Sequence, residues 1–325
     1  MTQILSPLSP TALNISETDV LNDLLRDKRS VNTKRAYRKD LTDFFRKMFA
    51  EDPTPEMVGL FLSMDRDEAL HLVSRYKGLL IDEELAEATV NRRLSALRSL
   101  VAYARRAGQC VWGLEDIRGE KVIAYRDTSG VDLESFQKML AVPDRQTQQG
   151  KRDYAILALF WETAMRCSEL HLCNIGDLDL EERTLWIQGK GRGTQKERVT
   201  IGDVSAIALE DWLSTRKHLE ANDPLIVALD IVHWGQRLST TSIYKVVRKI
   251  AKAAGISKVM SPHRVRHSSI TAALDATGGN VRAVQQLSRH AKPETVMRYD
   301  DNRKDVQGEV TEVLSGLLSE GLPTS

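Results

Sequence analysis

Apolar residues recur at helical spacing along the first third of the chain. Between residues 31 and 49 they follow the period of one helical face: Tyr37, Leu41, Phe44, Phe45 and Met48. A second set lies between residues 89 and 108: Val90, Leu94, Leu97, Val101 and Ala104. Asn32 or Thr33 is placed to cap the first helix, while Thr89 is placed to cap the second and Gly108 to end it. Both segments are therefore predicted to be amphipathic helices.

Shorter segments repeat this pattern at residues 21–25, 55–64 and 67–80. Together they predict an all-helical domain of four or five helices over residues 16–110. Residues 1–15 contain two Ser-Pro pairs and are expected to be a disordered N-terminus. Residues 111–130 have little helical periodicity and are expected to form an extended linker.

The second half of the chain mixes helical segments with one predicted hairpin. A helix begins near residue 131, and residues 151–175 are expected to form a long buried helix or a close pair. Two short strands, 184–190 and 197–201, are joined by a glycine-rich turn, which suits a hairpin because glycine tolerates positive φ. Helices follow near 204–220 and 240–255. The fold class is thus mainly α with a small antiparallel hairpin or sheet, in two domains.

The last segment, residues 304–325, is predicted to be an amphipathic tail helix that follows a second domain at 131–303. Its apolar residues recur at helical spacing: Val306, Val310, Val313, Leu314 and Leu317. Packing of this helix onto its own domain and docking onto a neighbouring copy of the chain are both open.

Composition narrows the class of protein. The 325 residues suffice for two domains, and apolar residues make up 42% of them, so a sizeable core can be buried. The net charge of +1 does not identify a nucleic-acid partner, but basic residues gather locally in 26–39 and 92–106. Three cysteines suit a reducing cytoplasm, and the start lacks a signal peptide. No run approaches the roughly 20 apolar residues of a membrane span, so no membrane partner is expected.

Residues 261–299 contain the densest group of reactive side chains. His263 and Arg266 are three apart and share a helical face, while His290 and Tyr299 flank a break at Pro293. Arginine binds phosphate with a rigid fork of donors, histidine transfers protons near neutral pH, and tyrosine can be a covalent nucleophile. Together these residue types describe a pocket for a phosphodiester.

Each of these features has a simpler explanation when it stands alone. A single HxxR pattern is usually a solvated helical face, and a single tyrosine is usually a packed aromatic. Cys167, His171 and Cys173 could be imagined as metal ligands, but they are only three and close in sequence, so buried thiols are favoured and no metal is expected. Glu169 either orients an arginine or a helix through a salt bridge, or forms an ordinary helical ion pair.

The decisive feature is an ordered set of six reactive residues: Arg166, Lys190, His263, Arg266, His290 and Tyr299. This Arg…Lys…HxxR…His…Tyr pattern resembles the tyrosine recombinase family of phage integrases and Xer-type recombinases, over nearly the whole chain. The family usually has glycine at the positions of Ala164 and Arg289, and a Thr-Thr pair where this chain has Glu294 and Thr295.

The resemblance implies a helical core-binding (SAM-like) domain, a linker and an α+β catalytic domain. It implies site-specific strand exchange on four protomers through a Holliday junction, with double-stranded DNA containing inverted repeats as the partner. The free protein would be a monomer or dimer, accessory DNA-bending proteins are possible partners, and the location would be the cytoplasm, at the nucleoid. It also favours docking of the tail helix on a neighbouring protomer.

The roles of the six residues follow from phosphodiester chemistry. Arg166 and Arg266 clamp the non-bridging oxygens, where negative charge develops. Lys190 protonates the leaving 5′ oxygen. His263 accepts the phenol proton or donates to the phosphate, and His290 holds a non-bridging oxygen. Tyr299 forms a 3′-phosphotyrosyl bond that a 5′ hydroxyl can later reverse, so no cofactor is expected.

Candidate DNA contacts lie on basic or polar helical faces in both domains. They are Lys34, Arg35, Arg38, Lys39, Arg92, Arg93, Arg98, Thr241, Tyr244, Lys245 and Arg264. The linker is long enough for the two domains to hold a duplex as a clamp, one on each face. Two alternatives remain open: a telomere resolvase or relaxing type IB topoisomerase of related chemistry, and a non-catalytic DNA-binding relative.

Overall fold

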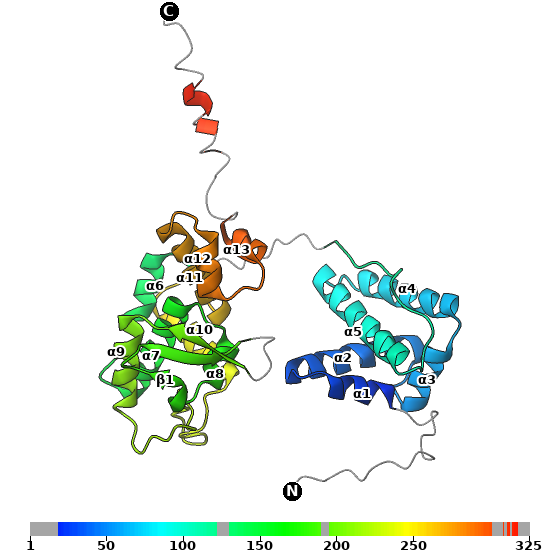
Figure 1. The fold of residues 1–325 in the computed structure, drawn as a ribbon, viewed down its shortest axis with the longest axis horizontal. Coiled ribbons are helices and arrows are strands. Elements are labelled where there is room, and N and C mark those ends of the chain that lie inside the picture. Colours follow the sequence, from blue (N-terminus) through cyan, green and yellow to red (C-terminus); the bar gives the residue numbers. More distant parts are fainter. Residues whose placement is uncertain are drawn as a thin grey trace, which may run out of the picture. The chain divides into compact units, whose positions relative to one another are not determined.

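The computed structural model describes residues 19–121, 130–189 and 195–300 and several positions between 308 and 317 (Figure 1). The chain divides into two compact units, Met1–Tyr125 and Arg126–Ser325. The predicted two-domain, mainly helical architecture with one small antiparallel sheet is confirmed. Within the described residues, no helix combines the length and the apolar character that a membrane crossing requires.

The N-terminal unit consists of helices (Figure 1). Their bounds are α1 (Val20–Asp27), α2 (Val31–Phe49), α3 (Pro55–Ser63), α4 (Arg66–Asp82) and α5 (Glu87–Arg106). Two predicted caps were wrong. The side chain of Ser30 caps α2 by accepting from the Thr33 N–H, and α5 begins after Ala86 without a side-chain cap, because Thr89 already lies in its first turn.

Aromatic side chains form the centre of this unit's core. Phe44 meets Phe61 and Tyr76 edge-on, with ring centroids 5.1 Å apart in both pairs. Trp112 packs against Phe61 with a centroid distance of 5.4 Å, and its Nε1 donates to the Met64 carbonyl at 3.0 Å. Residues 111–117 were predicted to belong to the linker. The structure instead has them contribute to the N-terminal core.

The C-terminal unit combines helices with a three-stranded antiparallel sheet (Figure 1). The strands are β1 (Leu178–Asp179), β2 (Thr184–Gln188) and β3 (Lys196–Thr200), in that order. The helices are α6 (Leu133–Leu140), α7 (Gln148–Thr163), α8 (Cys167–Leu172), α9 (Asp203–Leu213), α10 (Thr240–Ala253), α11 (Pro262–Ala276), α12 (Val281–Ser288) and α13 (Pro293–Asp300). A 3₁₀ turn, Ile175–Asp177, precedes β1.

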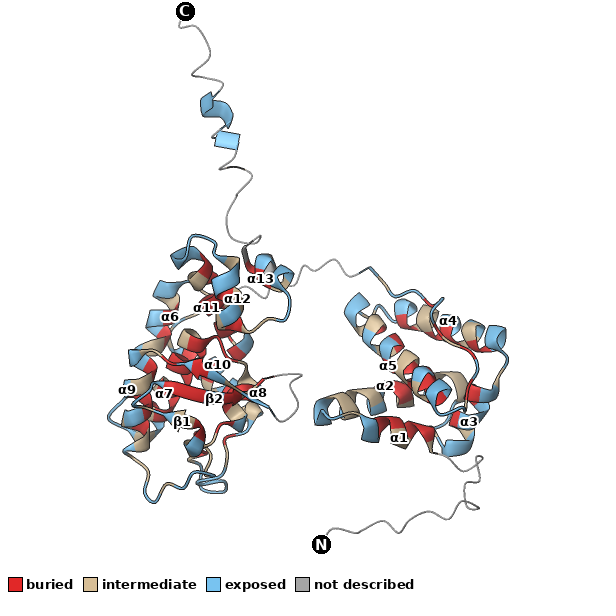
Figure 2. Ribbon diagram, viewed as in Figure 1, coloured by how far each residue is buried: buried red, intermediate tan, exposed pale blue. Residues whose placement is uncertain are grey.

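Helix α7 lies at the centre of this unit, buried over most of its length and in contact with α9 and α11 (Figure 2). Residues 151–175 were predicted to form either one long helix or a close pair. The structure has the pair, because the helix is interrupted between Thr163 at the end of α7 and Cys167 at the start of α8. Helix α9 ends at Leu213, before the expected end at 220. Arg166 lies at the interruption between α7 and α8, as the N-cap residue of α8.

Helices α11, α12 and α13 pack around a smaller apolar cluster. Its buried members are Ala164, Ile270, Leu274, Val284, Val296 and Tyr299. Ser261 caps α11 by accepting from the Arg264 N–H at 3.3 Å, and Asn280 caps α12 by accepting from the Ala283 N–H at 3.0 Å. In the tail, the described residues are helical and Leu314 and Leu317 are exposed, so its docking partner stays a prediction.

Candidate active site

Arg166 is held at the break between α7 and α8. It is the N-cap residue of α8, and Glu169 of the same helix closes a capping box with it. Glu169 Oε2 accepts from the Arg166 backbone N–H at 2.8 Å, and Oε1 accepts from the Arg166 Nη1 at 2.7 Å. The Glu169 side chain is fully buried at 0% exposure, while 27% of the Arg166 side chain is exposed. Glu169 therefore orients a guanidinium that still faces solvent, as the first of its two predicted roles requires.

Arg266 lies deeper, on α11, with only 1% of its surface exposed. Its guanidinium donates to the carbonyl oxygens of Ala164 and Ser288 and, from Nη2, to His290 Nε2 at 3.1 Å. Burial, and then the charges of Arg166 and Arg289, lower the pKa of Arg266 to about 10. It thus stays charged at neutral pH, and its position is fixed by the backbone on both sides of the pocket.

The histidines around these arginines are neutral at pH 7. Burial, followed by the charge of Arg266, lowers the pKa of His290 to about 4, and burial followed by His263 lowers that of His267 to about 4. Burial also lowers the pKa of His263. Because Arg266 can only donate, His290 Nε2 accepts, so its Nδ1 bears the proton and donates to Ser288 Oγ at 2.9 Å.

Tyr299 reaches this group from α13. Its ring centroid lies 4.3 Å from that of His267 and 5.7 Å from that of His290, and the residue is 8% exposed. Burial raises the pKa of the Tyr299 phenol, although the charge of Arg266 and a hydrogen bond with it act in the opposite direction. The phenol is therefore protonated in the free protein, and its oxygen lies beside a buried guanidinium.

The three candidate metal ligands near α8 make separate contacts. Cys167 Sγ donates to the Thr240 carbonyl at 3.7 Å and Cys173 Sγ to the Glu169 carbonyl at 3.2 Å. Burial raises the pKa of both thiols to about 12. Among the residues with a described position, no group of His, Cys, Asp and Glu has the arrangement of a metal site.

Two family models match the chain and together cover both units. The model described as "Phage integrase family" matches residues 131–305, and "Phage integrase, N-terminal SAM-like domain" matches residues 20–108. The chain belongs to the phage integrase family of tyrosine recombinases.

Curated relatives agree with this assignment, and solved structures share the fold. A tyrosine recombinase of Synechococcus elongatus is 49% identical over 98% of this chain and 100% of its own length. A tyrosine recombinase of Synechocystis sp. is 46% identical over 95% and 99%. In fold, the chain is similar to XerH bound to a palindromic difH substrate, with a TM-score of 0.67, 21% identity and coverage of 91% of this chain and 84% of that one. It is also similar to a lambda integrase dimer on a core site, with a TM-score of 0.61, 16% identity and coverage of 87% and 95%.

Five of the six residues that match the phage integrase pattern lie close together in this site: Arg166, His263, Arg266, His290 and Tyr299. The sixth, Lys190, lies outside the described residues, in the connection between β2 and β3. His267 was missed by the sequence prediction. It lies one helical turn after His263 on α11, and their ring centroids are 4.8 Å apart. That i, i+4 spacing to His263 was the available signal.

The two glycine positions of the family are both left-handed here. Ala164 has φ 47° and ψ 34°, and Arg289 has φ 57° and ψ 38°. A side chain in this conformation costs about 1–2 kcal/mol, which glycine avoids. The geometry explains why glycine suits these positions. In this chain, Ala164 and Arg289 adopt the same left-handed backbone conformation at a cost in backbone strain.

The candidate DNA contacts fall into two groups. Arg35, Arg38 and Lys39 on α2 and Thr241, Tyr244 and Lys245 on α10 are exposed, while Lys34 and Arg264 are half-buried. The second group lies on α5 and pairs within the N-terminal unit: Arg92 pairs with Asp40, Arg93 with Asp43, and Arg98 donates to the Ile117 carbonyl. In the first group, Arg38 also donates to Asn22 Oδ1 at 3.1 Å.

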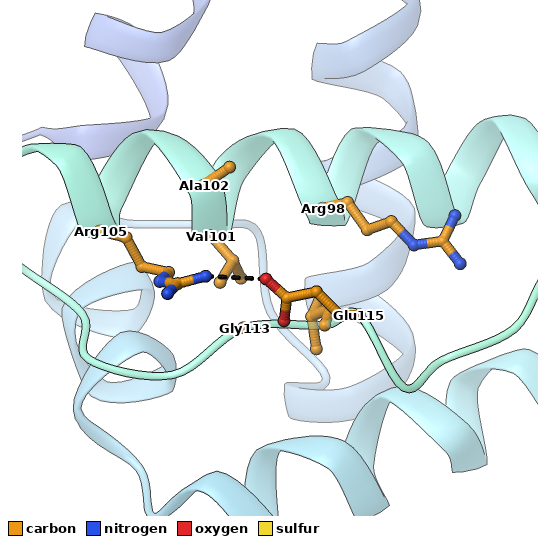
Figure 3. Close-up of a pocket in the computed structure, with 7 residues that line it drawn as sticks. Arg98, Val101, Ala102, Arg105, Gly113 and Glu115 are labelled. Carbon is orange, nitrogen blue, oxygen red and sulfur yellow. Dashed lines mark hydrogen bonds and ion pairs between the residues drawn. The ribbon is translucent and has the colours of Figure 1, made fainter.

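Arg93 departs furthest from its predicted role. Only 13% of its side chain is exposed, and it holds α5 against α2 and α4 through Asp43 and Tyr76. Next to it along α5, a hollow of about 140 Å³ is bordered by Arg98 and by Arg105, whose Nη1 pairs with Glu115 at 2.8 Å (Figure 3). The basic face of α5 is thus partly neutralised within its own unit.

Proposed function

We propose that this protein is a site-specific DNA recombinase that cleaves and rejoins strands through a covalent bond between Tyr299 and a 3′ phosphate. The observation that supports this most directly is the placement of the Tyr299 phenol beside the buried Arg266 guanidinium, within a group of neutral imidazoles. A nucleophile, charge-stabilising donors and proton acceptors are thereby brought to one place on a rigid scaffold.

In the proposed reaction the Tyr299 oxygen attacks the scissile phosphorus, and the bond from phosphorus to the 5′ oxygen breaks. Arg166 and Arg266 donate to the non-bridging oxygens, where charge accumulates in the five-coordinate state. We assign His263, kept neutral by its lowered pKa, to accept the phenol proton. Lys190 gives a proton to the departing 5′ oxygen, which leaves as a hydroxyl.

The reverse reaction reseals the strand without an external energy source, because the phosphotyrosyl ester retains the energy of the original phosphodiester. A 5′ hydroxyl from a second duplex can attack in place of the first, which exchanges strands. We therefore propose a tetramer on paired inverted-repeat sites, resolved through a Holliday junction and assisted by DNA-bending proteins. The protein would act in the cytoplasm, at the nucleoid.

The test begins with covalent capture. Wild-type protein is incubated with fragmented genomic DNA, the mixture is denatured, and DNA that stays attached to protein is sequenced. We expect enrichment of a site with inverted repeats. Uniform recovery of unrelated sequences would contradict site specificity.

Two plasmid substrates then separate recombination from relaxation. One contains a single copy of the captured site and the other contains two. A recombinase joins the two sites and leaves the single-site plasmid without recombinant product, whereas a relaxing topoisomerase changes the supercoiling of both equally. Closed hairpin ends would instead identify a telomere resolvase.

A further inference from the structure

Arg289 is a buried cation that shares the carboxylate of Glu169 with Arg166. Only 9% of its side chain is exposed, and its backbone is in the left-handed conformation that disfavours a side chain. It occupies the turn between α12 and α13, immediately before His290. A residue that is both buried and strained at this point requires a compensating interaction.

Its guanidinium joins four elements of the C-terminal unit. Nη1 donates to the Thr163 carbonyl at 3.0 Å, at the end of α7, and to the Leu287 carbonyl at 2.7 Å in α12. Nη2 donates to Glu169 Oε2 at 3.0 Å in α8, and Nε lies 3.7 Å from Glu197 Oε1 in β3. Strand β3 leads back to the connection that contains Lys190.

The charge arrangement explains what this contact does for Arg166. Glu169 is a completely buried carboxylate that pairs with both Arg166 and Arg289. With Arg166 alone, the pair would have no net charge, and the attraction of Arg166 for a phosphate would be largely cancelled. With Arg289 present, the three side chains together have a charge of +1, which the more distant Glu197, 3.7 Å from the Nε of Arg289 and 16% exposed, offsets only in part. Buried charges interact strongly because solvent screens them little.

We propose that Arg289 is a positioning residue for strand cleavage. It neutralises Glu169, so that the charge of Arg166 acts on the scissile phosphate, and it fixes the turn that presents His290. This role rests on the proposed function. It predicts that Arg289 affects the rate of cleavage more than the affinity for DNA.

A matched pair of variants separates charge from packing. Arg289→Lys keeps the cation, Arg289→Gln removes it, and both retain a side chain in the left-handed turn. Each protein is first bound to a nicked DNA substrate, and the rate of covalent adduct formation is then measured. The temperature is kept well below the melting temperature of the least stable variant. We expect Arg289→Gln to slow adduct formation about tenfold, with the dissociation constant for DNA changed less than twofold, and Arg289→Lys to retain most of the rate. Arg282→Gln, on the exposed face of α12, is the control and should match wild type.

A double-mutant cycle with Glu169→Gln tests the electrostatic pathway. Without the negative charge at position 169, Arg289 loses the carboxylate through which it acts on Arg166, so the double variant should cleave no more slowly than Glu169→Gln alone. Losses that multiply would overturn the proposal, and so would equal rates for Arg289→Lys and Arg289→Gln. If wild type itself forms no adduct, the proposed function fails and not this inference alone.

Discussion

Single side chains in this pocket have environments that suit their proposed roles. Arg266 is buried and fixed by backbone carbonyls, so it is preorganised before DNA arrives. Arg166 is partly exposed and tied to Glu169, so it can meet a phosphate from solvent. The imidazoles of His267 and His290 have strongly lowered pKa values and do not add positive charge at neutral pH.

Removing the Arg166 guanidinium should slow strand cleavage by about 10²–10³, because one preorganised donor to the transition state is lost. The measurement is the rate of adduct formation by Arg166→Ala on nicked DNA, with Arg282→Gln as the control. Cleavage by wild type should also persist in EDTA, since the arginines supply the charge. Loss on chelation with recovery in magnesium would contradict this mechanism.

The lowered histidine pKa values also predict how stability depends on pH. The pKa of His267 and of His290 is about 4 in the folded protein, against an ordinary value of 6.5. Between these values the unfolded chain binds more protons, so the free energy of unfolding decreases as pH falls from 6.5 toward about 4. Urea denaturation of wild type and His267→Gln tests this. The variant should lose less stability on acidification, and an identical pH dependence would be evidence against a neutral His267 imidazole in the folded protein.

At the scale of elements, periodicity predicted what depends on local sequence. The helices predicted at 31–49 and 89–108 and the hairpin all follow from spacing and composition. Trp112 shows the limit of that approach: it stands in a segment without periodicity, yet it is buried against Phe61, which is distant in sequence. The left-handed turn at Arg289 and the contact between the tilted rings of His267 and Tyr299 likewise depend on contacts between elements.

The connection between β2 and β3 contains the proposed general acid. If Lys190 protonates the leaving 5′ oxygen, Lys190→Ala should cleave ordinary DNA poorly but cleave a substrate with sulfur at the 5′-bridging position at nearly the wild-type rate, because a thiolate leaves without a proton. Adduct formation on both substrates is compared for Lys190→Ala and Arg166→Ala. Rescue of Arg166→Ala instead would assign the acid to Arg166.

At the scale of the whole molecule, each unit has its own buried core and its own candidate basic surface. The exposed residues of α2 belong to one unit, and those of α10 belong to the unit that holds the pocket. We expect both units to contact the same duplex, mainly through its phosphates. This is what the predicted clamp requires.

This expectation predicts a salt dependence that changes with truncation. Binding of the full chain should weaken steeply with salt, and a chain lacking residues 1–125 should bind more weakly with a shallower slope, because fewer counterions are released. The measurement is a salt titration of both proteins on the captured site, after circular dichroism has verified that the shorter chain is helical. Equal affinity and equal slope would show that the N-terminal unit does not contribute.

The central claim is that Tyr299 becomes covalently attached to DNA, and peptide mapping tests it most directly. The trapped adduct is digested with nuclease and trypsin and analysed by mass spectrometry. The account predicts a nucleotide on the peptide 299–303, and no adduct from Tyr299→Phe although that variant still binds the site. A nucleotide on another residue, such as Tyr244, or an adduct that persists in Tyr299→Phe, would contradict it.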